Sequence, residues 1–143
     1  MNRDKAKEVI KALESDGTLG MFPYHIAGSF RRGKEEGLHD VDIVVVNDFR
    51  DGNKETIRVL EEQVDLFYCS VDTFAPAYMT WTGSMKFNIM CRGKAKKMGL
   101  KFSQYGIFKK DTDDRVDDNT EEGIIKLLNV DPIYEVPCAR SNV

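Results

Sequence analysis

The segment from Asp40 to Val46, with the sequence DVDIVVV, constrains the fold of this 143-residue chain more than any other. Its run of Ile and Val predicts a buried strand over Val41–Val46, because β-branched side chains pack well on a pleated surface. Side chains alternate along a strand, so Asp40 and Asp42 point to one face and the apolar residue between them points to the other. The chain must therefore bury one face of this strand in a core and keep two carboxylates together on the opposite face.

Two neighbouring carboxylates indicate a cation site. They repel each other and raise each other's pKa unless a positive charge lies between them. Their hard oxygen atoms suit Mg²⁺, with Mn²⁺ as the alternative. A third acid, Asp65, lies within the apolar segment Val64–Phe67, where an uncompensated charge would be costly to bury. If Asp65 lies on a strand next to Asp40 and Asp42, the three carboxylates complete a site for two ions.

A phosphate-binding turn is predicted upstream of the acids, where the apolar strand Tyr24–Ala27 ends at Gly28 and Ser29. Glycine allows a close backbone approach, the Ser29 hydroxyl and free N–H groups can hold phosphate oxygens, and Arg32 can neutralise them. Ten residues separate Ser29 from Asp40. A Gly-Ser end, this spacing and an Asp-apolar-Asp strand are together typical of the nucleotidyltransferase superfamily.

The chain as a whole predicts an α+β fold, because helical and strand patterns are mixed without regular βαβ units. Helical periodicity covers residues 4–15, 84–98 and 120–128. Thr120 is the expected N-cap of the last helix. A small hairpin is predicted over residues 100–102 and 105–108. Residues 56–69 predict a strand that bends near Glu61, although residues 55–63 also fit a short helix.

Charge is distributed unevenly along the chain. Residues 81–110 include eight basic and no acidic side chains, whereas residues 111–122 include seven acidic side chains and one basic. The whole chain has a net charge of −3 at pH 7. A block of one sign often marks a surface that binds a polyanion, so the negative total does not exclude nucleic acid. A solvated helix face followed by an acidic loop is the alternative explanation of the same pattern.

Cysteine usage and hydropathy indicate the compartment. Three cysteines, an odd number without a Cys-x-x-Cys pair, predict reduced thiols. No apolar run approaches the roughly 20 residues that a membrane-spanning helix needs, and the first residues lack the apolar core of a secretory signal. We therefore expect a cytoplasmic, intracellular protein that is not secreted and has no membrane partner.

Longer motifs follow one another in a fixed order along the chain: Gly28–Glu35 (GSFRRGKE), Asp40–Asp42 (DVD), Gln63–Leu66 (QVDL), Thr80–Ser84 (TWTGS), Asn88, Arg92 and Lys97–Phe108. Together they resemble the motifs of the family X DNA polymerases, the polymerase beta group. The resemblance extends from about residue 27 to residue 140. The length is closest to the minimal palm-and-thumb polymerases X of large viruses, which suits a virus- or phage-encoded enzyme.

The resemblance implies a nucleotidyltransferase-fold palm over residues 1–73, with a mixed or antiparallel sheet and flanking helices. It implies a small α/β thumb over residues 74–143. The implied activity is that of a template-directed DNA polymerase of the repair or gap-filling type, which transfers dNMP from a dNTP to a primer 3′-hydroxyl by two-metal catalysis. The expected partners are dNTP and primer-template or gapped DNA, and the expected state is a monomer.

The family's residue roles carry over to the matching positions. The catalytic residues, which bind two Mg²⁺ ions, would be Asp40, Asp42 and Asp65. The nucleotide would contact Gly28, Ser29, Arg32, Thr80, Trp81, Gly83 and Asn88. The DNA would contact Lys86, Arg92, Lys94, Lys96, Lys97 and Lys101. The family also has a cis peptide bond at the position of Gly83–Ser84.

Several features depart from the family's pattern. Thr80 replaces an aromatic residue, which leaves the choice between dNTP and NTP open. Phe67 replaces an arginine that pairs with a catalytic aspartate in an inactive state, so we expect that switch to be absent. Residues 1–26 are too few for the family's amino-terminal lyase domain, so we expect no 5′-deoxyribose-phosphate lyase activity.

Two other functions stay open. A nucleotidyltransferase that acts on RNA, a small molecule or a protein shares the Gly-Ser and aspartate motifs, but it does not need a basic thumb. A catalytically inactive palm-thumb module that binds DNA is the second alternative. Such a module would have no reason to keep three carboxylates.

Overall fold

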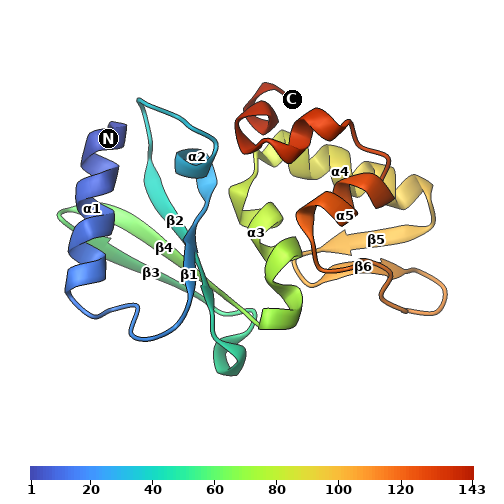
Figure 1. Ribbon diagram of the computed structural model, residues 1–143, viewed down its shortest axis with the longest axis horizontal. Coiled ribbons are helices and arrows are strands. Elements are labelled where there is room, and N and C mark those ends of the chain that lie inside the picture. Colours follow the sequence, from blue (N-terminus) through green and yellow to red (C-terminus); the bar gives the residue numbers. More distant parts are fainter.

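A four-stranded sheet in the amino-terminal half places the acidic strand at its centre (Figure 1). The computed structural model describes residues 1–143. The strands are β1 (Tyr24–Ile26), β2 (Asp40–Val46), β3 (Lys54–Val59) and β4 (Glu62–Cys69), in the spatial order β1-β2-β4-β3. Strands β2 and β4 are parallel and the other two pairs are antiparallel, so the sheet is mixed.

One face of this sheet is covered by helix α1 (Arg3–Ser15). Its side chains Ala6, Val9 and Leu13 are fully buried against the apolar residues of β2 and β4. The helix begins after Asn2, whose side chain accepts a hydrogen bond from the backbone N–H of Lys5. This packing fixes which side of the sheet is the core side, and the aspartates of β2 lie on the other side.

The opposite face of the sheet is only partly covered. Helix α3 (Phe74–Thr82) packs there on the carboxyl-terminal halves of β2 and β4, in a cluster that includes Val44, Cys69 and Ala77. The amino-terminal halves of β2 and β4, which carry the acids, stay outside this cluster. The sheet therefore has one covered face and one face with an open end.

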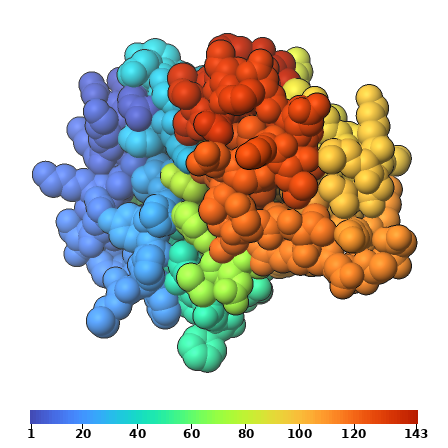
Figure 2. All heavy atoms as spheres, turned by 45° about the vertical axis from the view of Figure 1, so that its right-hand side comes forward, coloured from blue at the N-terminus to red at the C-terminus, as the bar shows by residue number.

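A second core lies in the carboxyl-terminal half. It joins α3 to α4 (Met85–Lys97), the hairpin β5 (Leu100–Ser103) and β6 (Gly106–Lys109), and α5 (Glu121–Leu127). Two 3₁₀ helices, η3 (Pro132–Glu135) and η4 (Pro137–Asn142), follow α5. In Figure 2 the red carboxyl-terminal segment lies beside the blue-to-cyan amino-terminal half, in agreement with the packing of η4 on the short helix α2 (Gly28–Arg31). No helix has both the length and the apolar character that crossing a membrane requires.

The expected α+β architecture is confirmed, with Thr120 capping α5 through the N–H of Gly123. The alternative prediction of a short helix over residues 55–63 is wrong, because Leu60 and Glu61 take positive φ angles and turn the chain from β3 into β4. The helix α3 was not predicted. A proline such as Pro76 usually indicates that a helix ends. Here it lies in the first turn of the helix, where no backbone N–H is needed. The division of the chain at residue 73 stays a prediction.

Glu121, the first residue of α5, joins the two halves of the molecule. Its carboxylate accepts hydrogen bonds from Arg31 at 2.9 and 2.5 Å and from Arg140 at 3.0 Å. Arg140 is fully buried, and its Nε donates to the carbonyl of Tyr134 at 2.8 Å. Burial alone would raise the pKa of Glu121, but the hydrogen bonds and charges of Arg31 and Arg140 outweigh it and hold that pKa below its usual value.

Replacing Glu121 by alanine should destabilise the protein by about 3–5 kcal/mol, because the buried Arg140 would lose its counter-charge. Chemical denaturation measures the change. The matched control is Glu122→Ala, which alters an exposed side chain in the same helical turn and should change stability by less than about 0.5 kcal/mol. Equal effects of the two substitutions would show that the shared carboxylate contributes nothing special.

Candidate metal and nucleotide site

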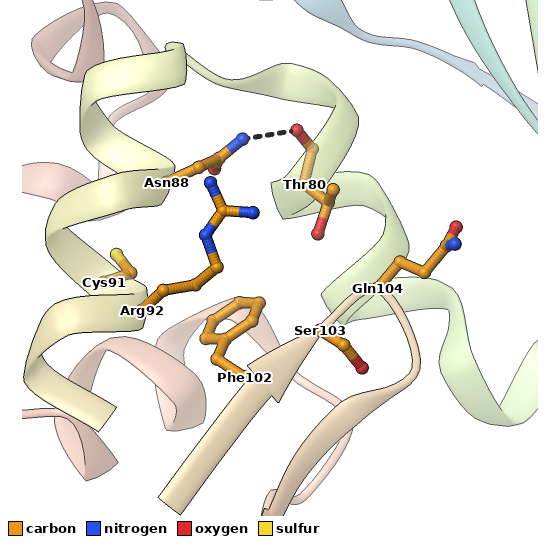
Figure 3. Close-up of a pocket in the computed structure, with 7 residues that line it drawn as sticks. All are labelled: Thr80, Asn88, Cys91, Arg92, Phe102, Ser103 and Gln104. Atoms are coloured by element: carbon orange, nitrogen blue, oxygen red, sulfur yellow. Dashed lines mark hydrogen bonds between the residues drawn. The ribbon is translucent and has the colours of Figure 1, made fainter. Parts of the chain in front are cut away.

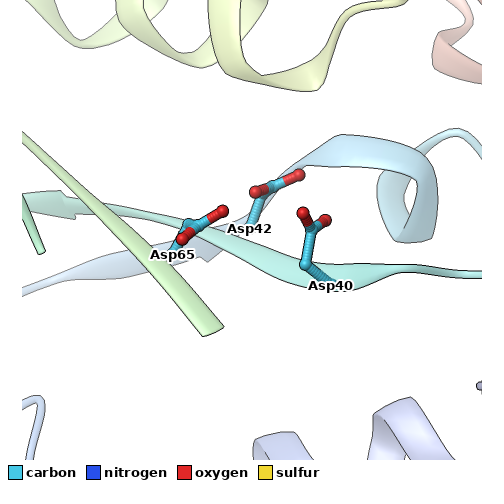
Figure 4. Close-up of side chains that lie close together, drawn as sticks. All are labelled: Asp40, Asp42 and Asp65. Carbon is cyan, nitrogen blue, oxygen red and sulfur yellow. The ribbon is translucent and has the colours of Figure 1, made fainter. Parts of the chain in front are cut away.

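Three carboxylates meet at the open end of the sheet. Asp40 and Asp42 project from β2 and Asp65 projects from β4, where Asp42 and Asp65 are direct partners in the parallel register. One oxygen from each lies within 4.8 Å of the others. Figure 4 shows all three side chains directed to the same side of the sheet. The sequence prediction that Asp65 lies on a strand next to the other two acids is confirmed.

The electrostatics of the cluster are those of an uncompensated anionic site. Burial raises the pKa of Asp42 from 3.8 to about 7, and the negative charges of Asp40 and Asp65 contribute to the same shift. The pKa of Asp40 is also raised, by burial and then by the charge of Asp65. The positive charge of Lys54 acts in the opposite direction on both carboxyl groups, without cancelling the shifts.

Asp65 is held by neutral hydrogen-bond donors. It is 4% exposed, and its Oδ1 accepts a hydrogen bond from the hydroxyl of Thr56 on β3 at 2.7 Å. The side-chain amide of Gln63 donates to both carboxylate oxygens at 3.2 Å. No basic side chain forms a salt bridge with Asp65. The carboxylate is therefore oriented by polar neighbours that leave its charge free to act on a ligand.

This donor set fits a divalent cation. Three carboxylates supply hard oxygen ligands, which Mg²⁺ and Mn²⁺ prefer to nitrogen or sulfur. Burial first, and then the charges of Asp40 and Asp65, raise the pKa of Asp42, and a cation between the carboxylates would favour its charged form. The three aspartates together could therefore bind a metal.

The predicted phosphate-binding turn lies directly against Asp42. The N–H of Ala27 donates to the carbonyl of Asp42 at 2.7 Å, which ties the end of β1 to β2. Gly28 has a φ of +59°, and a Cβ at this position would overlap the Asp42 carboxylate. Gly28 is thus required both by its backbone conformation and by the space that the acid occupies. Ser29, next in the chain, lies in the first turn of the short helix α2.

Arg32 connects this turn to the second predicted nucleotide-binding segment. Its Nη1 donates to the carbonyl of Thr82, and its Nε donates to the hydroxyl of Ser141 at 2.9 Å. A Cβ on Gly83 would lie 2.9 Å from Arg32 Nη1, so the guanidinium fills the space over this glycine. The Gly83–Ser84 peptide bond is cis, as the resemblance implied. The structure therefore brings the two predicted segments together through one arginine.

Trp81 forms a wall beside the acids. Its indole stacks on Phe67, with ring centroids 3.9 Å apart and an angle of 11° between the planes. Phe67 lies two residues after Asp65 on β4, so both side chains point to the same face of the sheet. No arginine stands at position 67 to pair with an aspartate, and the aromatic stack occupies that place instead.

Asn88 and Arg92 project from α4 into a pocket of the carboxyl-terminal half (Figure 3). The side-chain amide of Asn88 donates to the carbonyl of Thr80 on α3 at 2.8 Å. Phe102 and Ser103 of β5 form the opposite wall. Cys91 also lines this pocket, but burial raises the pKa of its thiol to about 11, so it stays uncharged near neutral pH.

The basic residues predicted to contact DNA lie on α4 and β5. Five of the six are exposed, namely Lys86, Arg92, Lys96, Lys97 and Lys101. Lys94 differs, because it is partly buried and its Nζ donates to the carbonyl of Asn129 at 3.2 Å. The exposed residues of α4 recur at helical spacing and form one basic face.

Comparison with known families agrees with this picture. Residues 77–135 match the family model of the DNA polymerase beta thumb, a segment that runs from α3 to the end of η3. The fold and this match define the class, an α+β protein with a polymerase beta-type thumb. The match covers less than half of the chain, and it supports the resemblance to the family X polymerases that the motifs had indicated. No curated protein matches the sequence.

Sequence reasoning missed several residues around the site. Gln63 lies two residues before Asp65, and the strand period alone could have placed both on one face. Thr56 and Lys54 reach the site only through the pairing of β3 with β4, which the sequence left undecided. The pairing of Arg31 with Glu121 spans 90 positions and left no local signal.

The pKa of Asp42 gives the metal-free protein a defined pH dependence. The ordinary value is 3.8 and the folded value is about 7, so the folded state holds more protons than the unfolded chain between these limits. Stability should therefore fall as the pH rises from about 4 to about 7. In Asp42→Asn this loss should be smaller, with the raised pKa of Asp40 leaving part of it. The variant should exceed the wild type at about pH 8 by a few kcal/mol, since one pKa unit is worth about 1.4 kcal/mol.

Urea unfolding with a chelator at both ends of this pH range measures the effect. Mg²⁺ should stabilise the wild type at about pH 8 more than it stabilises Asp42→Asn. Asp4→Asn, an exposed substitution in α1, should follow the wild type throughout. A variant at position 42 with the pH profile of the wild type would contradict the raised pKa.

Proposed function

We propose that this protein is a template-directed DNA polymerase of the gap-filling type, which transfers dNMP from a dNTP to a primer 3′-hydroxyl. The observation that carries the proposal is the cluster of Asp40, Asp42 and Asp65 on adjacent parallel strands, beside a glycine turn and packed against a polymerase beta-type thumb. Residues 1–73 would act as the palm and residues 74–143 as the thumb. The catalytic carboxylates would hold two Mg²⁺ ions, or Mn²⁺ ions.

Ions held by these carboxylates would supply Lewis-acid stabilisation of the attacking and leaving oxygens of an in-line displacement. The chain itself positions the reactants. Gly28 lets the backbone of the turn lie directly against Asp42, and Ser29 and Arg32 offer a hydroxyl and a positive charge to the triphosphate. Asp65, oriented by Thr56 and Gln63, would lie on the side of the primer hydroxyl.

The carboxyl-terminal half would hold the base and the template. Trp81 and Gly83 would border the sugar, because Trp81 stacks on Phe67, two residues after Asp65, and Gly83 packs on Arg32. Asn88 would face the base of the incoming nucleotide, and Arg92 would approach the template strand. The basic face of α4 would bind backbone phosphates without regard to sequence.

The alternative activities use only part of this arrangement. A nucleotidyltransferase acting on RNA, a small molecule or a protein would use the carboxylates and the glycine turn, but it gives no reason for a basic face on α4. An inactive DNA-binding module would gain stability by losing the acids, since Asp42 carries a pKa of about 7 in the folded state. Template-directed synthesis gives both features a use.

Primer extension on a gapped duplex with Mg²⁺ tests the proposal directly. The wild type should add the templated dNTP, and Asp65→Asn should lose at least about 100-fold in rate, as expected when one preorganised group that stabilises the transition state is removed. Binding of the same DNA should persist in the variant, because Asp65 makes its contacts within the sheet.

The matched control for this experiment is Asp111→Asn, in the exposed loop after β6, which should extend the primer at the wild-type rate. A wild-type protein that extends no primer, or that adds nucleotides without regard to the template, would overturn the proposal. Transfer of a nucleotide to RNA, a small molecule or a protein instead would favour the alternative enzyme.

The basic face of α4 makes a separate prediction about binding. The slope of log K against log salt should become shallower by about 0.9 for each DNA phosphate that the protein no longer neutralises. Lys96→Ala and Lys97→Ala should each flatten the slope in this way, because both side chains are exposed on that face. Lys94→Ala should change it less, since its Nζ is held by Asn129. Identical slopes for all three variants and the wild type would remove α4 from the DNA interface.

A further inference from the structure

The open face of the sheet extends beyond the aspartates to the edge strand β3. Thr56 of β3 lies opposite Asp65, and its hydroxyl bonds to that carboxylate, so alternate residues of β3 share the face of the acids. These alternate residues are Lys54, Thr56 and Arg58. The intervening side chains are less exposed, and Ile57 and Val59 pack against the core under α1.

Lys54 and Arg58 are two exposed cations that flank Asp65 on this face. Lys54 pairs with Phe67 in the register and its Nζ lies 5.3 Å from the centre of that ring. Arg58 pairs with Gln63, and its Nη2 donates to the carbonyl of Glu61 at 2.9 Å, which leaves its other donors free. Neither side chain forms a salt bridge.

Lys54 lies two residues before Thr56, whose hydroxyl bonds to Asp65, so both side chains are on the face of the acids. Arg58 lies in the same row of the sheet as Asp40, with Gln63 between them. Neighbouring strands are about 4.8 Å apart, so this row places the backbone of Arg58 about 10 Å from that of Asp40. The side chains of both cations could therefore reach a substrate that is held by the acids.

The geometry of an in-line displacement indicates whether the nucleotide or the primer strand lies next to β3. The attacking and leaving oxygens lie on opposite sides of the reacting phosphorus. The phosphate-binding turn at Gly28 is at the end of β1, on one side of Asp42, and Asp65 is on the other side, next to β3. If pyrophosphate leaves toward the turn, the strand that carries the attacking hydroxyl must approach from the side of β3.

We propose that Lys54 and Arg58 bind backbone phosphates of the primer strand, near the 3′ end that enters the aspartate cluster. The proposal rests on the polymerase function proposed above and adds a second basic surface to that of α4. The two residues are four positions apart on one strand, or about 13 Å, so they would contact phosphates of different nucleotides. The thumb would then hold the template while the edge of the sheet holds the primer.

The same charges also have a simpler explanation. Edge strands often carry Lys and Arg because these residues discourage pairing with another chain. That role needs charge on the edge, but it does not require both cations to lie on the face of the acids. It also predicts no preference for either strand of a duplex, which gives the two explanations different outcomes.

Binding of primer-template DNA without metal ions, followed by fluorescence anisotropy at several salt concentrations, tests the proposal. Lys54→Ala and Arg58→Ala should each reduce the salt slope by about 0.9, and the double variant by about twice as much. Lys54→Arg should keep the wild-type slope. Duplexes with methylphosphonate linkages, which lack the phosphate charge, identify the strand that is contacted.

Neutral linkages near the primer 3′ end should weaken binding by the wild type and have little further effect on the double variant. Neutral linkages in the template should weaken both proteins alike. Lys7→Ala and Lys11→Ala serve as matched controls, since both lysines are exposed on α1 at the other face of the sheet and should leave the slope unchanged.

Primer extension by the same preparations separates the two levels of the hypothesis. A wild type that extends primers, with unchanged slopes and an unchanged response to the primer linkages in the double variant, would overturn the role of β3 and leave the polymerase function standing. A wild type that neither binds nor extends the duplex would overturn both.

Discussion

Parallel pairing of β2 with β4 is the constraint on which the site depends. It places Asp42 directly opposite Asp65 and brings three negative charges within 4.8 Å. Their repulsion costs free energy, and the fold accommodates it by burying the alternate residues of the same strands under α1. Every other part of the site is arranged around this cluster: the glycine turn on one side, the aromatic stack above, and the basic edge of β3 on the other side.

The acidic residues of the two regions have different kinds of partner. Arg31 and Arg140 are both committed to Glu121, at the junction of the two halves. The neighbours that bond to Asp65 are instead neutral, a hydroxyl and an amide. Strong ion pairs thus hold the halves together, while the acidic cluster keeps its charge for a ligand.

Much of the site could be predicted because its signals are local. The alternation of acids and aliphatic residues from Asp40 to Val46 determines the strand, its buried face and the position of two carboxylates. The placement of Asp65 required the further assumption that its strand lies next to β2, and the apolar residues around it supported that assumption. The helices with a clear apolar period, α1 and α4, were predicted to within one residue at either end.

What could not be predicted depends on contacts between distant residues. The turn at Leu60 and Glu61 contains no glycine that would indicate a turn. The sequence therefore could not distinguish the hairpin that brings Thr56 to Asp65 from a short helix. Helix α3 was not predicted because Pro76 usually interrupts a helix, although a proline in the first turn does not destabilise it. The burial of Arg140 could not be predicted either. Arginine is rarely buried without an acidic partner, and its partner Glu121 is brought to it only by the packing of the folded chain.

The Glu121 ion pairs also bear on the order in which the molecule assembles. The four strands are complete once residue 69 has been synthesised, so the sheet and its acidic cluster can form early on the ribosome. Arg31 lies in that early part, but its partner is made 90 residues later, and Arg140 later still. During synthesis the sheet must therefore persist with its junction surface open, and the joining of the halves is a late event.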